Sequence, residues 1–323
     1  MIPIQELILK TSASQSILSE EIVQQLWSDY GNIKRYHLKG GKQPSVIVKH
    51  IQLPEKNQHP KGWNTNLSHQ RKLTSYRVER QWYKHYAQQT DITCRVPQIY
   101  HTAESENELL LIMEDLDASG YAKRLHHKKV TLLHAESCLT WLAHFHAKFM
   151  NNSAAGLWPV GTYWHLETRP DEWEKMENIE LKEAAKTVSD RLQNAQYQTL
   201  IHRDAKLANF CFGEQKEVAA VDFQYVGKGC GMKDVAYFIS SCFEADKCEQ
   251  YEEELLTHYF KQLELSLDKD IDFQELKMEW STLYRYAWAD FYRFLDGWSS
   301  GHWKMHFYSK KLTQIVLNEL KTT

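Results

Sequence analysis

The residues best suited to catalysis lie between His202 and Asn209 and, slightly later, at Asp222. A hydroxyl that attacks the γ-phosphate of a nucleotide needs a carboxylate to accept its proton, and the accompanying Mg²⁺ needs oxygen ligands from a second carboxylate and an amide. The pattern H-x-D-x-x-x-x-N, followed by a hydrophobic strand that ends in D-F, supplies these groups as Asp204, Asn209 and Asp222. This order of residues predicts phosphate transfer from ATP with Mg²⁺ as cofactor.

Each residue of this segment has an expected role. Asp204 is the candidate catalytic base, or a carboxylate that orients the attacking hydroxyl, and His202 would brace the loop. Lys206 would place its ammonium on the γ-phosphate, unless it is a solvated lysine. Asn209 and Asp222 are the candidate Mg²⁺ ligands. Their structural alternatives are a turn residue for Asn209 and a strand-end cap for Asp222.

A second pair of charged residues is expected to hold the nucleotide. The β-branched run 45–51 predicts a strand in which Lys49 ends the apolar part, and helical spacing over 68–89 places Glu79 in the middle of a helix. In the context of the downstream loop, Lys49 would grip the α- and β-phosphates and Glu79 would fix its position. Taken alone, the two residues would be a surface lysine and a solvated glutamate.

The loop that would cover the phosphates is poorly defined in the sequence. It contains no G-x-G-x-x-G, and Gly31 and Asn32, just before a strand over 33–38, are the candidates for exposed backbone N–H groups. The same two residues would also suit a simple tight turn.

The remaining pattern changes from strands to helices along the chain. Ser19 is expected to cap a short helix with Ile22, Val23, Leu26 and Trp27 on its apolar face, and residues 39–42 to form a turn. A polar loop passes through Pro54, Pro60 and Gly62. Further strands are predicted at 96–100 and 109–113, followed by a hinge at 114–117. Beyond it, helices are predicted at 132–150, from 232, at 252–265 and within 280–320, with short strands at 200–224.

Composition limits the function classes. At 323 residues and 42% hydrophobic content, the chain can bury a large core. The net charge of −3 argues against a nucleic-acid binder, which would carry an excess of Lys and Arg. No segment is long and apolar enough to span a membrane, and the six cysteines form no C-x-x-C pair, as expected of a cytoplasmic protein. The expected partner is a small hydroxylated molecule; the sequence sets no oligomeric state.

An aromatic and partly acidic stretch near the carboxyl terminus is the candidate substrate pocket. Trp288 belongs to a stripe at helical spacing that also suits plain core. Asp290 and Asp296 lie between the aromatic residues, and with them could hold a cationic amine. Alternatively, Asp290 pairs with Arg293 one turn away, and the pocket accepts a neutral, apolar alcohol.

Together these segments resemble the aminoglycoside phosphotransferase and choline kinase group of the protein-kinase-like superfamily, and most closely its ecdysteroid-kinase-like branch with bacterial relatives. The resemblance covers nearly the whole chain and rests on residues 75–79, 111–116, 202–209, 222–224 and 231–238.

The resemblance implies an α+β, bilobal kinase-like fold. An N-terminal nucleotide-binding lobe, residues 1–116, would hold a small antiparallel sheet and one main helix, and residues 117–323 would form a larger, mostly helical catalytic and substrate-binding lobe. It also implies that the backbone near Met113, Glu114 and Leu116 binds adenine, and that Arg169 lines the substrate pocket.

One departure from the family keeps other functions open. Most relatives carry H-G-D, whereas this chain has His202-Arg203-Asp204 with Lys206, as in protein kinases. A protein Ser/Thr kinase is therefore an alternative, although there is no A-P-E segment and the span 224–234 is too short for a phosphorylated activation loop. A nucleotide-binding pseudokinase without transfer activity is another, because the phosphate loop is poor.

Overall fold

The computed structural model describes residues 2–26, 30–52 and 66–322. The chain forms two compact units, each discontinuous in sequence. The first contains Met1–Asp91, Arg95–Lys123 and Cys211–Gln224, and the second contains Ile92–Cys94, Arg124–Phe210 and Tyr225–Thr323. The division of functions between residues 1–116 and 117–323 stays a prediction.

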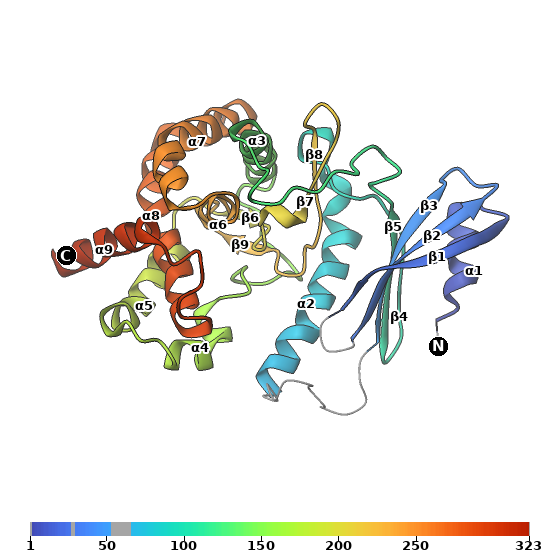
Figure 1. The fold of residues 1–323 in the computed structure, drawn as a ribbon, viewed down its shortest axis with the longest axis horizontal. Coiled ribbons are helices and arrows are strands. Elements are labelled where there is room, and N and C mark those ends of the chain that lie inside the picture. The colour runs from blue at the N-terminus through green and yellow to red at the C-terminus, as the bar shows by residue number, and fades with distance from the viewer. Residues whose placement is uncertain (1, 27–29, 53–65, 323) are drawn as a thin grey trace. The chain divides into compact units, whose positions relative to one another are not determined.

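An antiparallel five-stranded sheet forms the body of the first unit (Figure 1). Its strand order is β1-β2-β3-β5-β4, and β3 and β5 lie inside the sheet with partners on both sides. The strands are β1 (Ser16–Gln25), β2 (Gly31–Lys39), β3 (Ser45–Gln52), β4 (Ile99–Glu104) and β5 (Glu108–Glu114). The expected α+β fold, with a small antiparallel sheet first and helices afterwards, is confirmed.

The helix predicted from Ser19 is wrong, because this segment belongs to β1. Its backbone pairs with β2 from Ser16 to Gln25, so the chain is extended where helical spacing had been expected. Ile22 is 58% exposed and Val23 is 50% exposed, so these side chains do not form a buried helical face. β-branched side chains favour an extended backbone, and nothing packs on a helical stripe here. Trp27 lies outside the described residues, as do Pro54, Pro60 and Gly62.

The amino-terminal helix is instead α1 (Ile4–Ser12), which the sequence had not indicated. Its Ile8 is fully buried in a cluster with Val46, Val48 and Leu110 of the sheet. A nine-residue helix is too short to be stable alone, so this packing stabilises it.

The strand predicted over 96–100 begins later than expected, at Ile99. Pro97 lies within the predicted range and has no N–H to donate to a neighbouring strand, so pairing starts only beyond it.

The main helix of the first unit is α2 (Asn66–His85), close to the predicted 68–89 and followed by the 3₁₀ turn η2 (Ala87–Gln89). Its buried Trp82 stacks on Phe223, with ring centroids 4.4 Å apart, and Tyr83 meets the same ring edge-on. Because Phe223 follows Asp222 directly, this aromatic packing fixes the backbone next to the candidate metal ligand.

Gly31 is required by close packing at the start of β2. Its φ is +120°, and a Cβ there would lie 2.0 Å from the carbonyl oxygen of His50. We expect Gly31→Ala to lower the free energy of unfolding by about 1–3 kcal/mol, measured by urea denaturation. Gly120→Ala is the matched control, since Gly120 has a φ of +93° but its Cβ would meet nothing within 4 Å. Equal losses in the two variants would refute the steric explanation.

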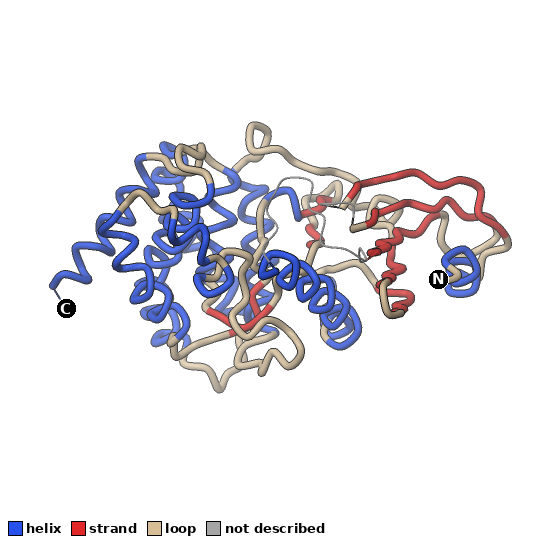
Figure 2. Tube along the Cα trace, turned by 90° about the horizontal axis from the view of Figure 1, so that it is seen from below, coloured by secondary structure: helices blue, strands red, loops and turns tan. Residues whose placement is uncertain are grey.

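The second unit is mostly helical, as its tube trace shows (Figure 2). α8 is its central helix and contacts α4, α5, α6 and α9. The helices are α3 (Leu132–Lys148), α4 (Pro170–Glu174), α5 (Ile179–Gln193), α6 (Met232–Cys242), α7 (Ala245–Ser266), α8 (Phe273–Trp298) and α9 (Phe307–Thr322). They include each helix predicted beyond the hinge, and the region 280–320 divides into α8 and α9.

Short strands and turns carry the candidate catalytic segment. β6 (Thr199–Ile201) pairs with β9 (Gly227–Gly229) immediately before His202. The 3₁₀ turn η5 (Leu207–Asn209) ends at the candidate metal ligand, and β7 (Phe210–Phe212) pairs with β8 (Val218–Ala220). Two other 3₁₀ turns of the described residues are η3 (Ile92–Cys94) and η4 (Leu166–Thr168). None of the helices in the described ranges is long and apolar enough to cross a membrane.

Candidate active site

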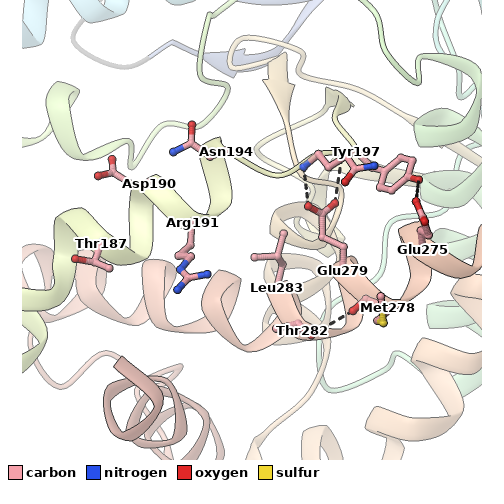
Figure 3. A pocket seen from close by; sticks show the side chains of 11 residues that line it. Thr187, Asp190, Arg191, Asn194, Tyr197, Glu275, Met278, Glu279, Thr282 and Leu283 are labelled. Carbon is pink, nitrogen blue, oxygen red and sulfur yellow. Dashed lines mark hydrogen bonds between the residues drawn. The ribbon is translucent and has the colours of Figure 1, made fainter. Parts of the chain in front are cut away.

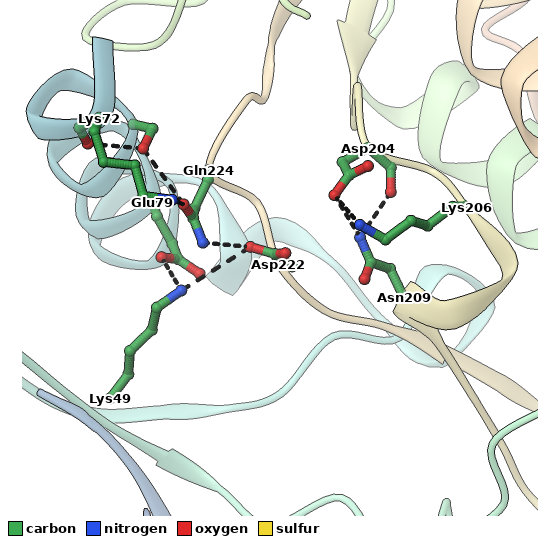
Figure 4. Close-up of polar contacts among 9 residues, drawn as sticks. Lys49, Lys72, Glu79, Asp204, Lys206, Asn209, Asp222 and Gln224 are labelled. Carbon is green, nitrogen blue, oxygen red and sulfur yellow. Dashed lines mark hydrogen bonds and ion pairs between the residues drawn. The ribbon is translucent and has the colours of Figure 1, made fainter. Parts of the chain in front are cut away.

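The first unit brings Lys49 and Glu79 together as predicted. Lys49 Nζ lies 2.6 Å from Glu79 Oε2, and both side chains are buried (Figure 4). Lys49 is held in the middle of the sheet, since β3 pairs with β2 and β5 at this residue. Burial raises the pKa of Glu79, against the opposing charge of Lys49. Such a buried pair fixes the lysine in one direction; its nucleotide role stays a prediction.

Asp222 lies close to the same lysine. Its Oδ1 is 4.0 Å from Lys49 Nζ and accepts a 2.7 Å hydrogen bond from Gln224 Nε2. The Gln224 amide oxygen in turn accepts from Ser75 on α2, at 3.3 Å. Asp222 has a φ of +71°, which is uncommon for a residue with a side chain. Its side chain is 34% exposed, so the carboxylate can reach a ligand.

The phosphate-loop and hinge candidates are largely engaged in the sheet. Asn32 pairs with Gln25 on one side and with His50 on the other, so it belongs to the strand ladder. Met113 and Glu114 end β5, and the Glu114 carboxylate accepts from Arg95 and from the backbone N–H of Gln98.

Leu116 is buried, and its carbonyl oxygen accepts from the backbone N–H of Tyr121 at 2.8 Å. These contacts make the backbone around the predicted hinge rigid, and they leave its adenine-binding role a prediction.

In the second unit, Asp204 is the centre of a polar cluster (Figure 4). Its Oδ2 lies 2.7 Å from Lys206 Nζ and accepts from the Asn209 amide nitrogen at 3.1 Å. The same Asn209 nitrogen donates to the Asp204 backbone carbonyl at 2.7 Å. Tyr237 on α6 donates its hydroxyl to Asp204 Oδ1 at 3.2 Å. The carboxylate is thus fixed on both oxygens while one-tenth of its side chain remains exposed.

A buried aspartate on α6 holds the catalytic loop in place. Asp234 accepts from the backbone N–H groups of His202 and Arg203, at 2.6 and 2.8 Å, and lies 3.2 Å from His146 Nε2. Burial acts to raise the pKa of Asp234, but its bond to His146 and the neighbouring positive charges keep it below its usual range.

The loop itself is tightly bent. The backbone N–H of Asp204 donates to His202 Nδ1 at 3.3 Å, and the bracing role of this histidine stays a prediction. Arg203, between them, has a φ of +69°. Non-glycine residues with such a backbone concentrate at functional sites, where surrounding contacts maintain them.

The candidate substrate residues have partners within the protein. Asp290 is buried between Lys233 at 3.1 Å and Arg293 at 2.7 Å, which is the alternative that the helical spacing allowed. Asp296 accepts from the backbone N–H groups of Glu177 and Asn178, each at 2.9 Å.

Trp288 and Arg169 also have internal contacts. Trp288 is 1% exposed, and its ring meets Tyr308 edge-on. Arg169 pairs with Glu172 at 2.8 Å. All four candidate substrate residues thus have contacts within the protein, and their substrate role stays a prediction.

Sequence patterns missed three residues in the surroundings of Asp204. Asp234 and Tyr237 lie in the segment 231–238, whose resemblance to a family was visible although the role of each side chain was not. Lys304, in the loop between α8 and α9, lies with its Nζ 4.6 Å from the centre of the Tyr237 ring. No periodicity or motif pointed to it.

A hollow of about 760 Å³ between α5 and α8 contains none of the predicted residues (Figure 3). Its Glu279 carboxylate accepts from the backbone N–H groups of Gln196 and Tyr197, at 2.6 and 3.0 Å. Glu275 accepts from the Tyr197 hydroxyl at 3.0 Å. These two carboxylates therefore hold the segment that follows α5 to α8, which gives them a structural role.

Comparison with known proteins identifies the family. The model of the phosphotransferase enzyme family, APH, matches residues 22–269. The chain belongs to this family. No curated protein matches it significantly. The recognition from residues 75–79, 111–116, 202–209, 222–224 and 231–238 is thereby confirmed at the level of the family.

Solved structures of this phosphotransferase group share the fold. The choline kinase LicA from Streptococcus pneumoniae is 16% identical, with a TM-score of 0.51, over 99% of each chain. The microcompartment-associated aminopropanol kinase is 13% identical, with a TM-score of 0.50, over 96% of this chain and 92% of its own. Identities this low show the kinase-like fold and leave the substrate undetermined.

Proposed function

We propose that this phosphotransferase is an ATP-dependent kinase that transfers the γ-phosphate to a hydroxyl of a small molecule. The observation that carries the proposal is the environment of Asp204. Its carboxylate is held by Lys206, Asn209 and Tyr237 in a tightly bent loop, and part of it remains exposed. A base fixed in this way can meet a substrate hydroxyl without first reorganising.

The proposed transfer forms a bond between the acceptor oxygen and the γ-phosphorus and breaks the bond from that phosphorus to ADP. The proton of the acceptor hydroxyl passes to a carboxylate oxygen of Asp204. General base catalysis contributes roughly 10²–10⁴ in rate, and positioning supplies much of the rest. Lys206, 39% exposed, would place a positive charge near the transferred phosphate.

Nucleotide binding is assigned to residues of the first unit. Lys49, held by Glu79, would contact the α- and β-phosphates, and backbone near Met113, Glu114 and Leu116 would hold adenine. The backbone at Gly31 and Asn32 would lie nearest the phosphates. The buried Lys49 and Glu79 pair supports this part of the proposal, because it gives the ammonium a fixed direction.

Asn209 and Asp222 fit the ligand chemistry of Mg²⁺. The Asn209 nitrogen makes both of its hydrogen bonds to Asp204, which leaves the amide oxygen as its free acceptor among the described residues. The Asp222 carboxylate is partly exposed, and hard oxygen ligands of these two kinds suit the ion. When bound, Mg²⁺ would neutralise charge on the phosphate oxygens. The proposal requires both residues to serve one nucleotide.

The Lys49→Met variant tests nucleotide binding directly. Loss of a charge-assisted hydrogen bond is expected to raise the Kd for Mg-ATP about tenfold to a hundredfold, measured by calorimetry. Because this variant leaves Glu79 buried and unpaired, the double variant Lys49→Met/Glu79→Gln should recover stability but not affinity. Lys186→Met, at an exposed lysine on α5, is the control. An unchanged Kd in both Lys49 variants would contradict the assigned role.

The proposal also concerns the chemical class of the molecule that accepts the phosphate. The two kinases of similar fold are named for choline and aminopropanol, which are amino alcohols. The motifs at 75–79 and 222–224 support an acceptor of the ecdysteroid-kinase-like kind, a hydroxylated apolar molecule.

The proposed location is the cytoplasm. The six cysteines are buried free thiols, which suits this reducing compartment.

A screen of hydroxylated metabolites with Mg-ATP, read by coupled ADP release, tests the function. ADP release that depends on one acceptor supports it. Labelling of generic protein substrates by radioactive ATP would favour a protein kinase instead. Binding of Mg-ATP without transfer to any member of a broad alcohol panel would favour a nucleotide-binding module.

A further inference from the structure

Lys304 is a buried cation next to the proposed catalytic carboxylate. It lies in the loop between α8 and α9 and is 8% exposed. Its Nζ is 4.6 Å from the centre of the Tyr237 ring and 5.4 Å from that of Phe291. The hydroxyl of the same Tyr237 donates to Asp204 Oδ1. One tyrosine therefore contacts Lys304 with its ring and the catalytic residue with its hydroxyl.

Among the described residues, no carboxylate forms an ion pair with Lys304, and no oxygen accepts a hydrogen bond from its ammonium. The charges that act on it most are Asp204, which attracts it, and Lys206, which repels it. Glu244 is a further charge in this region, since it acts on His306 of the same loop. Because Lys206 already pairs with Asp204 at 2.7 Å, these three side chains carry one negative charge against two positive ones. A buried cation without an anion is costly, and the cost falls when an anion binds.

Burial lowers the pKa of Lys304 to about 8, although the charge of Asp204 opposes the shift. At neutral pH most Lys304 side chains therefore carry a proton and a positive charge. The other titratable groups that interact with its charge include His302 and His306 on the same loop, His127, Cys242 and Cys248.

A flat aromatic surface adjoins this cation. Lys304 Nζ lies 5.6 Å from the ring centre of Trp303, which is 44% exposed. The Trp303 ring stacks on His127 and His302, with centroids 5.2 and 6.0 Å apart. Stacking on both imidazoles fixes the indole ring, whose exposed part can pack against an apolar or planar ligand.

We infer that Lys304 and Trp303 select an acceptor that carries an acidic group and a flat apolar part in addition to its hydroxyl. The inference rests on the proposed kinase function, which makes Asp204 the place where the acceptor hydroxyl binds. The acidic group pairs with Lys304, the apolar part packs on Trp303, and the hydroxyl faces Asp204. A cationic acceptor, by contrast, would meet the repulsion of two lysines.

Matched probes of the same shape and different charge test this inference. The probes are para-(hydroxymethyl)benzoate, its neutral benzamide and the corresponding benzylamine, each with one ring and one hydroxyl. Their Kd values for the full chain are measured by calorimetry without nucleotide, so the result does not depend on turnover. A charge-assisted hydrogen bond predicts that the benzoate binds about tenfold or more tightly than the benzamide.

Substitutions at Lys304 show whether it causes the preference. Lys304→Met keeps the length of the side chain and removes the charge, and is expected to abolish the preference for benzoate. Lys304→Arg keeps the charge and should retain the preference for benzoate. Lys310→Gln, at an exposed lysine of α9, should leave this preference unchanged. Circular dichroism spectra identical to the parent chain show that each variant is folded. A preference that survives Lys304→Met overturns the inference.

Three further outcomes also decide against it. Tighter binding of the benzylamine, or no binding of the benzoate at millimolar concentration, contradicts an acidic acceptor. A large loss of Mg-ATP affinity in Lys304→Met, with the probe preference intact, would assign Lys304 to the nucleotide phosphates instead. If the benzoate preference holds but no acceptor is ever phosphorylated, the binding site stands and the proposed kinase function fails.

Discussion

Asp204→Asn is expected to lower kcat for phosphoryl transfer by about 10²–10⁴ while leaving the Kd for Mg-ATP unchanged. Asparagine has the same shape and can still accept through its oxygen from Asn209, which now bonds to the carboxylate at 3.1 Å. It cannot take the proton of the acceptor hydroxyl. The rate is measured by ADP release with the best acceptor of the metabolite screen, and binding by calorimetry.

A matched substitution separates this effect from a general change of charge. Asp190→Asn removes an exposed carboxylate on α5 that pairs with Lys186 on the surface, so kcat should stay within error. If Asp204→Asn retained full turnover, the catalytic role of Asp204 would be refuted. If it also abolished Mg-ATP binding, the carboxylate would belong to the nucleotide site.

The catalytic segment could be predicted because its residues lie close together in the sequence. His202, Asp204, Lys206 and Asn209 fall within eight positions, and the chemistry of phosphoryl transfer fixes their types and order. Lys49 and Glu79 are 30 positions apart. They could be paired only because the downstream loop suggested which lysine and which helix glutamate to choose.

Other features depend on packing that has no local pattern. The segment after Ser19 has apolar residues at helical spacing, yet pairing with β2 makes it a strand, because edge-strand pairing outweighs a weak periodicity. Lys304 belongs to no motif, and its importance comes from the rings of Tyr237, Phe291 and Trp303 around it. Sequence alone cannot show that distant aromatic residues bury a charge.

Asp290 shows the same difficulty for a residue that the sequence did single out. Its position between aromatic residues suggested that Asp290 binds a cationic substrate. The structure places it 1% exposed, accepting from the Trp164 indole N–H at 2.9 Å and paired with Lys233 and Arg293. Burial acts to raise the pKa of Asp290, but the two cations hold it well below its usual range. Such a group stabilises the folded chain above the unfolded pKa, about 3.9, and less as the pH falls.

Asp290→Asn is therefore expected to lower the free energy of unfolding by about 3–5 kcal/mol at neutral pH, measured by urea denaturation. The substitution keeps the shape of the side chain but leaves Lys233 and Arg293 buried without an anion. Since Asp290 contributes its stability only when ionised, the difference between parent and variant should shrink as the pH falls below about 4. Asp190→Asn, at an exposed pair, should cost no more than about 1 kcal/mol. A raised KM for the acceptor with unchanged stability would instead show that Asp290 binds substrate, as its place in the sequence first suggested.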